Sequence, residues 1–375
     1  MSFINLLKNL SNLKINFLPP KKSNLLVYDR IAAEAGFVSM LFKTKNYEIL
    51  NIRYESVNLY VLILSLLKSN FNYKKINKNY KKIYLEKVNP KIVYTITDYN
   101  PAFYELKNLY SKPVYVSDQF GIAKVNNQTW PNDFSRKCDE INRRSTKKLS
   151  ADLVFVFNQN EKMQMSKYIR SKVVALGNTK CNNFILSNKE KNKKKKKIIF
   201  INSGLYEKTI NNEIKMFNVL KKYCSQKNIP LEMIGRKEKS SENFYRETFG
   251  DGNWKYIPSR RGDLSAYLAL SCDSLIVFSH SSLGLEALAI GHRCVIILHN
   301  LAKKNMSWKH PSEGFFWTNK IDVKNIGKVI DRVLTVKTNN WKVKTKKIVK
   351  FYLEHDYQNK KKKKLIKKKL IEKRF

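Results

Sequence analysis

The sequence predicts an α/β protein with two Rossmann-like parallel-sheet domains. Three observations carry this prediction: short apolar runs recur along the chain, polar residues follow each run at its carboxyl end, and helical stretches separate the runs. Strands buried on both faces and joined by helices form open parallel sheets, which bind ligands along their carboxyl edge. At 375 residues the chain has enough length for two such cores.

The first half of the chain begins with residues 1–22, which we expect to form an amphipathic leader that lies on the protein surface or on a membrane. A helix is expected from residue 55 or 58 to 67, and a second one over 103–109. Asp29 and Asp98 stand at the carboxyl ends of two predicted strands, and Asp118 follows a third. The predicted strands are 24–29 (NLLVYD), 48–54 (EILNIRY), 91–98 (KIVYTITD), 114–117, 151–157 (ADLVFVF) and 173–176 (VVAL).

A polar stretch at 177–184 (GNTKCNNF) and the lysine-rich run after it mark the strongest change of composition in the chain. Such a change is typical of a boundary between domains. We therefore predict an N-terminal domain over 1–185, a C-terminal domain over 186–345 and a basic C-terminal helix or tail over 346–375.

The C-terminal domain repeats the alternation of strands and helices. Helices are predicted over 263–270, 283–290 and 325–334. The predicted strands are 198–201, 231–234, 254–258, 275–278 and 294–298.

The segment 273–298 (DSLIVFSHSSLGLEALAIGHRCVIIL) is the most informative part of the chain. It predicts a strand, a hydroxyl-rich turn, a helix that Gly291 ends, and a second strand. Unpaired amides at the helix start favour an anion such as a diphosphate, with Ser281, Ser282 and the bare backbone of Gly284 beside it. Glu286 could accept hydrogen bonds from a ribose diol. The structural alternative is that a serine only caps the helix and Glu286 only complements its dipole.

Composition narrows the class of protein. A hydrophobic content of 43% is typical of a globular chain. The longest strongly apolar run, 59–67, is far shorter than the roughly 20 residues that span a bilayer. Residues 1–18 lack the features of a signal peptide, and the five cysteines lack disulfide or zinc spacing. These observations predict a reduced, cytoplasmic protein.

The net charge of +43 leaves three interpretations open. Clusters at 193–197 and 360–369 could hold the protein peripherally on an anionic inner-membrane surface, bind nucleic acid through phosphates, or form a solvated tail. No motif that reads DNA or RNA accompanies the lysines, so no specific nucleic-acid partner is predicted.

Three motifs resemble those of GT-B glycosyltransferases of bacterial surface-carbohydrate and O-antigen biosynthesis. VNPKIVYTITDYNPAFYELK at 88–107, followed by Gln119–Phe120–Gly121, resembles their strand, Phe-Tyr pair and QxG turn. GNTKCNNF resembles an interdomain stretch of Kdo-transferase-like and glycerophosphotransferase-like members. SHSSLGLEALAIG resembles the donor-nucleotide element.

The resemblance implies two Rossmann-like domains with a cleft between them and a glycosyltransferase that moves a sugar from a nucleotide-sugar to a lipid-linked or growing surface polysaccharide. It implies that Ser281, Ser282 and Gly284 face the donor phosphates, that Glu286 binds the ribose, and that Gly204 and Arg236 line the donor site. A general base would come from the N-terminal domain, with Asp98 preferred and Asp29 second; a turn-forming role is the alternative for each.

The resemblance implies no metal and no cofactor apart from the donor, and a glycan or glycolipid acceptor as partner. A mechanism that needs an N-terminal histidine is not expected, because no histidine precedes His280. His280 itself could contact donor phosphate or only cap the strand end. A non-hydrolysing nucleotide-sugar epimerase and a non-catalytic nucleotide-sugar or glycan-binding protein remain as alternatives.

Overall fold

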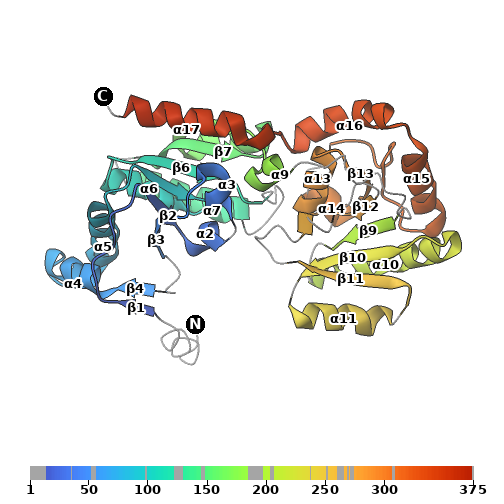
Figure 1. Ribbon diagram of the computed structural model, residues 1–375, viewed down its shortest axis with the longest axis horizontal. Helices are drawn as coiled ribbons and strands as arrows, with labels where there is room; N and C mark the ends of the chain where they lie inside the picture. The colour runs from blue at the N-terminus through green and yellow to red at the C-terminus, as the bar shows by residue number, and fades with distance from the viewer. Residues whose placement is uncertain are drawn as a thin grey trace. The chain divides into compact units, whose positions relative to one another are not determined.

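A computed structural model of the chain describes residues 14–373. The residues inside this range that are not described are 35, 52–55, 98, 122–129, 145–147, 185–196, 203–206, 237, 251, 260–265, 268–269, 271–273 and 306–308. The chain forms two compact units, coloured by chain order in Figure 1. Unit 1 contains Met1–Phe120, Asn132–Thr179 and Asn359–Phe375, and unit 2 contains Gly121–Pro131 and Lys180–Gln358. The prediction of two parallel-sheet domains is confirmed.

In the described part of unit 1, six parallel strands form one sheet in the order β3-β2-β5-β6-β7-β8. Numbered along the chain, this is the flavodoxin-like order 2-1-3-4-5 with a sixth strand added. The strands are β2 (Leu25–Tyr28), β3 (Glu48–Leu50), β5 (Ile92–Thr95), β6 (Val114–Asp118), β7 (Ser150–Val156) and β8 (Arg170–Ala175).

Helices cover both faces of this sheet, so alternate residues of each strand enter different cores. In β2, Leu26 and Tyr28 pack with one set of helices, while Leu25 and Val27 pack with the other. The first set is α4 (Leu59–Lys68), α5 (Tyr73–Val88), α6 (Pro101–Leu109), α7 (Trp130–Arg144) and α8 (Gln159–Tyr168). The second set is α2 (Arg30–Glu34), α3 (Phe37–Phe42) and α17 (Lys360–Glu372).

Asparagine, which is abundant in this chain, starts several of these helices. The side chains of Asn58, Asn100 and Asn158 accept hydrogen bonds from backbone amides at the starts of α4, α6 and α8. Pro101 follows the cap of α6 and needs no amide partner there. The caps fix where each helix begins after its strand or loop.

The N-terminal region contains a pair of strands that the sequence did not predict. The helix predicted after Glu55 and Asn58 begins at Leu59 with Asn58 as its N-cap, and Ser56–Asn58 forms β4. This strand pairs in parallel with β1 (Lys14–Asn16), which lies within the segment expected to be an amphipathic leader. Asn58 forms the last residue of β4 and also caps α4, so the strand and the helix share one turn.

In unit 2, six strands within the described ranges form the sheet β11-β10-β9-β12-β13-β14. Numbered along the chain, the order is 3-2-1-4-5-6, which is that of dinucleotide-binding Rossmann folds. The strands are β9 (Lys197–Ile201), β10 (Leu231–Arg236), β11 (Trp254–Ser259), β12 (Ser274–Phe278), β13 (Arg293–Ile297) and β14 (Trp317–Thr318). The helices are α10 (Glu207–Lys227), α11 (Lys239–Phe249), α13 (Ser282–Ala289), α14 (Asn300–Asn305), α15 (Val323–Thr335) and α16 (Thr338–Tyr352).

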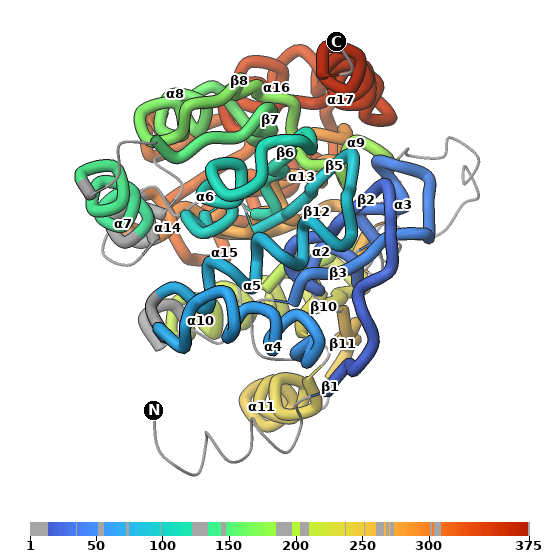
Figure 2. The backbone as a smooth tube through the Cα atoms, turned by 90° about the vertical axis from the view of Figure 1, so that its left-hand side faces the viewer, coloured from blue at the N-terminus to red at the C-terminus, as the bar shows by residue number. Residues whose placement is uncertain are grey.

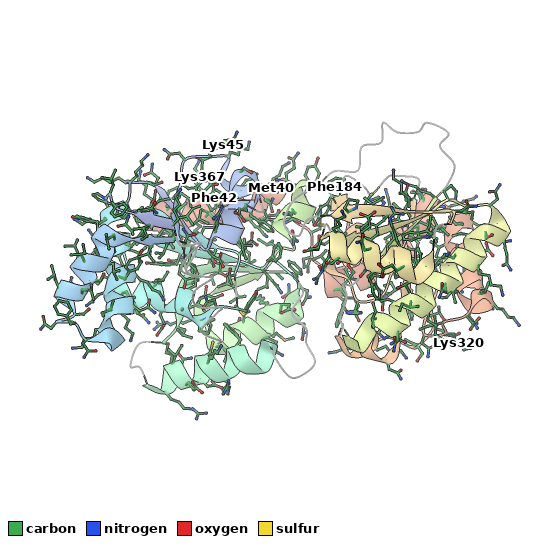
Figure 3. All side chains as sticks on the ribbon, turned by 90° about the horizontal axis from the view of Figure 1, so that it is seen from below. Met40, Phe42, Lys45, Phe184, Lys320 and Lys367 are labelled. Carbon is green, nitrogen blue, oxygen red and sulfur yellow. The ribbon has the colours of Figure 1, made fainter. Side chains whose placement is uncertain are left out.

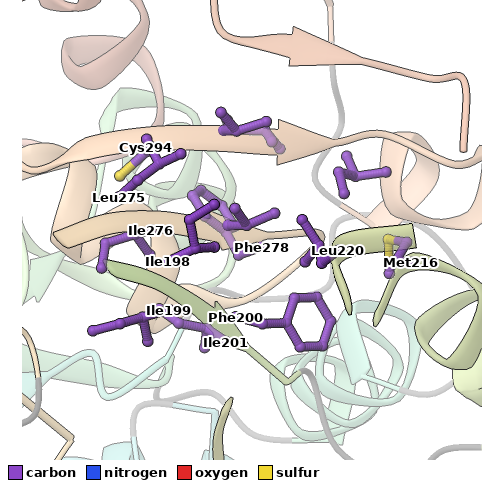
Figure 4. Close-up of a cluster of buried hydrophobic side chains, with 14 of the residues drawn as sticks. Ile198, Ile199, Phe200, Ile201, Met216, Leu220, Leu275, Ile276, Phe278 and Cys294 are labelled. Carbon is purple, nitrogen blue, oxygen red and sulfur yellow. The ribbon is translucent and has the colours of Figure 1, made fainter. Parts of the chain in front are cut away.

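The centre of unit 2 is a continuous apolar core around β9 and β12. Figure 4 shows Phe200 of β9 and Phe278 of β12 among aliphatic side chains, with Met216 and Leu220 of α10 beside them. All four are buried. This rigid centre holds the turn that follows β12, which is the segment of greatest functional interest.

The basic C-terminal segment belongs partly to each unit. Helix α16 lies in unit 2, and α17 packs on unit 1 against β6, β7 and α3 (Figure 1). The short helix η1 (Tyr357–Asn359) joins them, and Gln358 and Asn359 both adopt the left-handed conformation there. Figure 3 labels Phe42 of α3 and Lys367 of α17 on this face of unit 1. Earlier in the chain, beyond the short segment Gly121–Pro131, the boundary at which the chain passes from unit 1 to unit 2 falls between Thr179 and Lys180.

Candidate functional site in the second sheet

The carboxyl edge of the unit 2 sheet has its switch point between β9 and β12, the two adjacent strands from which the order runs outward in opposite directions. Parallel sheets bind ligands at this position, because the loops leaving the two strands diverge and open a crevice. Asn202 follows β9, and Ser279, His280 and Ser281 follow β12. The predicted donor element therefore lies at the switch point.

Ser281 is the residue that precedes the first turn of α13. Its backbone is extended (φ −95°, ψ 131°), and its carbonyl accepts the first hydrogen bond of the helix from Leu285 at 3.2 Å. Within the described residues of this helix, the Ser281 side chain makes no capping hydrogen bond. Ser281 and Ser282 are both partly exposed. Amides of the first turn are directed to the start of the helix, where an anion is favoured, and Ser281 lies beside them.

Gly284 is buried in the first turn of α13. A Cβ at this position would overlap the ring of Phe278, the last residue of β12. The glycine therefore allows the helix to pack closely on the strand that precedes it, and this close packing brings Ser281 and Ser282 to the sheet edge. This role explains the glycine without direct contact to a ligand.

Glu286 lies one turn into α13 and is almost completely buried, at 4% exposure. Its Oε2 accepts a hydrogen bond from the Tyr267 hydroxyl. Burial raises the pKa of the Glu286 carboxyl to about 8, and the nearby Lys180 ammonium opposes that shift. A buried carboxyl group with a strongly raised pKa at a sheet edge is typical of functional sites.

The surroundings of Glu286 come from parts of the chain that the sequence did not connect with it. Lys180 and Cys181 belong to α9 (Thr179–Asn183), which forms part of the GNTKCNNF stretch. Cys181 Sγ donates to the Glu286 carbonyl at 3.7 Å, and the rings of Phe184 and Tyr267 lie 5.5 Å apart. The sequence predicts a domain boundary at this stretch, and two of its residues, Lys180 and Cys181, also lie beside Glu286.

The structure describes only one of the other two residues predicted to line the donor site, Arg236 and Gly204. Arg236 ends β10, next to β9, so it shares the carboxyl edge with Ser281 but lies on the far side of β9. Its carbonyl accepts a hydrogen bond from the Tyr256 hydroxyl at 2.7 Å. Gly204 lies outside the described residues, so its predicted role stays a prediction.

Two histidines follow adjacent strands at this edge. His280 follows β12 and His299 follows β13, and their rings lie 5.8 Å apart at nearly right angles. His299 Nδ1 accepts a hydrogen bond from the Ala302 amide at 3.3 Å. Burial lowers the pKa of His299 to about 4. The His299 ring is therefore neutral near pH 7. Its proximity to His280 was not predicted.

In unit 1, Asp29 lies at the corresponding switch point, between β2 and β5. Its backbone is left-handed (φ 84°) and its side chain is fully buried. Oδ1 accepts from the Ile31 amide at 3.1 Å, and Oδ2 accepts from the Thr97 hydroxyl at 3.0 Å. These bonds form the turn that starts α2, which is the structural role considered for this residue. Asp98 lies outside the described residues.

Asp118, the third carboxylate at a strand end, forms a buried ion pair. Lys362 Nζ lies 2.7 Å from its Oδ1, and both side chains have 0% exposure. The hydroxyls of Tyr94 and Thr179 donate to its Oδ2. Lys362 also donates to the Gly177 carbonyl at 2.8 Å. This network fixes α17 to the sheet of unit 1 and accounts for the residue without a catalytic role.

Among the residues that the structure describes, no group of three or more His, Cys, Asp or Glu side chains is arranged to hold a metal ion. In the same ranges, none of the helices combines the length and the apolar character that crossing a membrane requires.

Comparison with solved structures places the chain in the GT-B fold class. The glycosyltransferase of Rickettsia africae ESF-5 is 13% identical, with a TM-score of 0.52 and coverage of 93% of this chain and 99% of that one. MnaA of S. aureus, solved with UDP, is 13% identical, with a TM-score of 0.51 and coverage of 96% and 97%. The UDP-GlcNAc 2-epimerase of Methanocaldococcus jannaschii is 14% identical, with a TM-score of 0.51 and coverage of 87% and 94%.

A comparison with protein families adds a match over the second half of the chain. The family described as "putative O-antigen biosynthesis protein" matches residues 202–370, from the end of β9 into α17. The match includes β12, α13 and Glu286. A search among curated proteins found no match.

Proposed function

We propose that this chain is a GT-B glycosyltransferase that transfers a sugar from a nucleotide-sugar to a lipid-linked or growing surface polysaccharide. The observation that carries the proposal is the position of Ser281, Ser282 and buried Glu286 at the switch point of a 3-2-1-4-5-6 sheet. The family match over this half of the chain supports the surface-polysaccharide part of the proposal.

In this proposal the start of α13 binds the donor diphosphate. First-turn amides, the Ser281 and Ser282 hydroxyls and the helix dipole stabilise negative charge on the departing nucleotide. Glu286 accepts hydrogen bonds from the ribose, chiefly through Oε1, because Oε2 already accepts from Tyr267. Arg236 and Gly204 line the donor site. A base from unit 1, Asp98 or Asp29, takes the proton of the acceptor hydroxyl in an inverting reaction.

The proposed donor site is tested by thermal unfolding of the full chain with UDP, GDP, CMP and their sugars. UDP is the first candidate, because MnaA was solved with it. A ligand at 100 times its Kd adds about 2.7 kcal/mol to the free energy of unfolding. One nucleotide should stabilise the parent chain, and this stabilisation should be smaller in Glu286→Ala and in Ser281→Val, whose parent serine is partly exposed. That result supports the site. Glu313→Ala, at an exposed glutamate of unit 2, is the matched control.

Stabilisation by none of the nucleotides, in a folded sample, contradicts the donor site. An epimerase is the second candidate function, because the M. jannaschii epimerase shares the fold at a TM-score of 0.51. Incubation with UDP-GlcNAc alone separates the two activities: an epimerase changes the sugar without an acceptor, whereas a transferase needs one. Binding with neither reaction supports the non-catalytic alternative.

A further inference from the structure

A cluster of exposed apolar side chains lies on one part of unit 1. We name it the β1–α4 surface and define it by Ile15, Phe17, Leu18, Ile63, Leu67 and Phe71, which are between 48% and 78% exposed. The pairing of β1 with β4 brings its two sequence segments together. Asn58, at the start of α4, donates to the Leu18 carbonyl at 2.8 Å. Figures 1 and 2 both place β1 beside α4.

Helix α4 is apolar on both sides: Val61 and Leu64 pack toward the core, while other apolar side chains of the helix are exposed. Its sequence is LYVLILSLLK, and its serine, Ser65, is fully buried and donates to the Val61 carbonyl at 2.6 Å. Ile63 and Leu67, which are one turn apart and share a face, are instead exposed. A helix at a water interface normally directs its polar residues outward. The exposed side of α4 therefore suits an apolar environment.

The charge around this surface is mainly positive, although α5 also carries the exposed Glu86, which lies 3.9 Å from Lys82. Residues 14–22 and 56–85 contain no aspartate or glutamate. Among the side chains that the structure describes in these segments, the exposed lysines are Lys14, Lys21, Lys22, Lys68, Lys75 and Lys78. Lys75 and Lys78 belong to α5, which packs against α4. An apolar centre with mainly cations around it is complementary to a surface that has anions outside and an apolar interior beneath them.

We propose that the β1–α4 surface docks this protein on an anionic lipid bilayer. The apolar side chains enter the boundary between headgroups and acyl chains, and the lysines contact headgroup phosphates, as in other proteins that lie on a membrane without spanning it. The proposal moves the contact from the basic helix α17 to the β1–α4 surface, which is a different part of unit 1. It is independent of the donor site, since the two lie in different units.

The test is co-sedimentation of the full chain with vesicles of phosphatidylcholine alone and of phosphatidylcholine mixed with phosphatidylglycerol. We expect binding to the mixed vesicles that weakens as salt rises. The variant Ile63→Ser/Leu67→Ser/Phe71→Asn should bind about tenfold or more weakly, because its apolar anchor is removed. Asparagine is chosen at Phe71 because it tolerates the positive φ of 57° found there. Circular dichroism checks that the variant is folded.

Two matched controls locate the effect. Met163→Ser/Val343→Ser removes equally exposed apolar side chains elsewhere and should leave vesicle binding unchanged. Lys68→Gln/Lys75→Gln/Lys78→Gln should weaken binding more than Lys364→Gln/Lys367→Gln/Lys368→Gln on α17. Vesicle binding that survives the apolar substitutions, or that depends only on the α17 lysines, overturns the proposal. A second result also overturns it: neither the parent nor the apolar variant binds vesicles, and sedimentation shows a dimeric parent but a monomeric variant. The surface is then an interface between two copies of the chain. Binding of the parent to an acidic protein but to no vesicle also overturns it.

Discussion

Gly284 faces the ring of Phe278, which closes the core beneath the start of α13. Phe278 is fully buried. In an exposed helix an alanine would be favoured over glycine by about 1 kcal/mol. Here its methyl group would overlap the ring, and overpacking of this kind costs about 1–3 kcal/mol. The steric cost therefore exceeds the gain in helix propensity.

We predict that Gly284→Ala lowers the free energy of unfolding by about 1–2 kcal/mol, measured by urea denaturation. The control is Gly252→Ala in the same unit, where a Cβ would meet its nearest atom, Lys221 Nζ, at 3.8 Å. It should change stability by less than about 0.5 kcal/mol. Equal stability of Gly284→Ala and the parent would show that α13 can move away from β12.

At the scale of elements, the attachment of α17 to the sheet of unit 1 depends on one buried lysine. Lys362 is fully buried and bonded to Asp118, the Gly177 carbonyl and the Thr179 hydroxyl. Removing one partner of a buried ion pair leaves the other charge uncompensated, which typically costs about 3–5 kcal/mol. The exposed Lys367 of the same helix has no comparable surroundings.

We therefore predict that Lys362→Met destabilises the chain by about 3–5 kcal/mol, while Lys367→Met changes stability by less than about 0.5 kcal/mol. Guanidinium denaturation measures both. Adding Asp118→Asn to Lys362→Met should recover part of the loss, because the unpaired charge is gone while the bonds from Tyr94 and Thr179 can persist. If Lys362→Met and Lys367→Met unfold at the same midpoint, the ion pair does not hold α17 in place.

The same helix shows what limits prediction from the sequence. In KKKKKLIKKKLIE lysine occupies eight of the thirteen positions, so residue type alone does not distinguish the buried Lys362 from its neighbours; only its helical spacing from Leu365 and Ile366 places it on their face. By contrast, the apolar runs that became β2, β5, β9 and β12 were clear, because a strand buried on both faces must be apolar at successive positions. The order of the strands within each sheet was not predictable, since it depends on crossovers between distant segments.

In the candidate site, too, some residues could be predicted from the sequence and others could not. Ser281, Ser282 and Glu286 could be predicted, because a strand, a short polar turn and a helix follow one another directly in the sequence. Tyr267 and Lys180 could not, since they reach Glu286 only through folding of the whole of unit 2. Nothing in the residue types near Glu286 indicated that its carboxyl would be buried and its pKa raised.

At the scale of the whole molecule, three buried groups give stability a dependence on pH with two opposing parts. The pKa of Glu286 is raised from 4.5 to about 8, so its neutral form is favoured in the folded state, and stability falls as pH rises from 4.5 to 8. Burial lowers the pKa of His292 and of His299 from 6.5 to about 4. Each histidine therefore contributes stability that is present above pH 6.5 and is lost as pH falls toward 4.

These three groups predict a maximum of stability near pH 6.5. Each group changes the free energy of unfolding by about 1.4 kcal/mol per pH unit inside its window. Below pH 6.5 the two histidines outweigh the single glutamate, so stability rises with pH. Between 6.5 and 8 only Glu286 still contributes, so stability falls. Urea denaturation at a series of pH values measures the curve. His292→Leu/His299→Leu should reduce the rising part and move the maximum to lower pH, with a remainder from His310 and His355, whose pKa values burial also lowers. Glu286→Gln should flatten the part above pH 6.5. A parental curve that is flat between pH 5 and 8 would contradict both assignments, because the buried groups would then titrate with the same pKa values in the folded and unfolded chains.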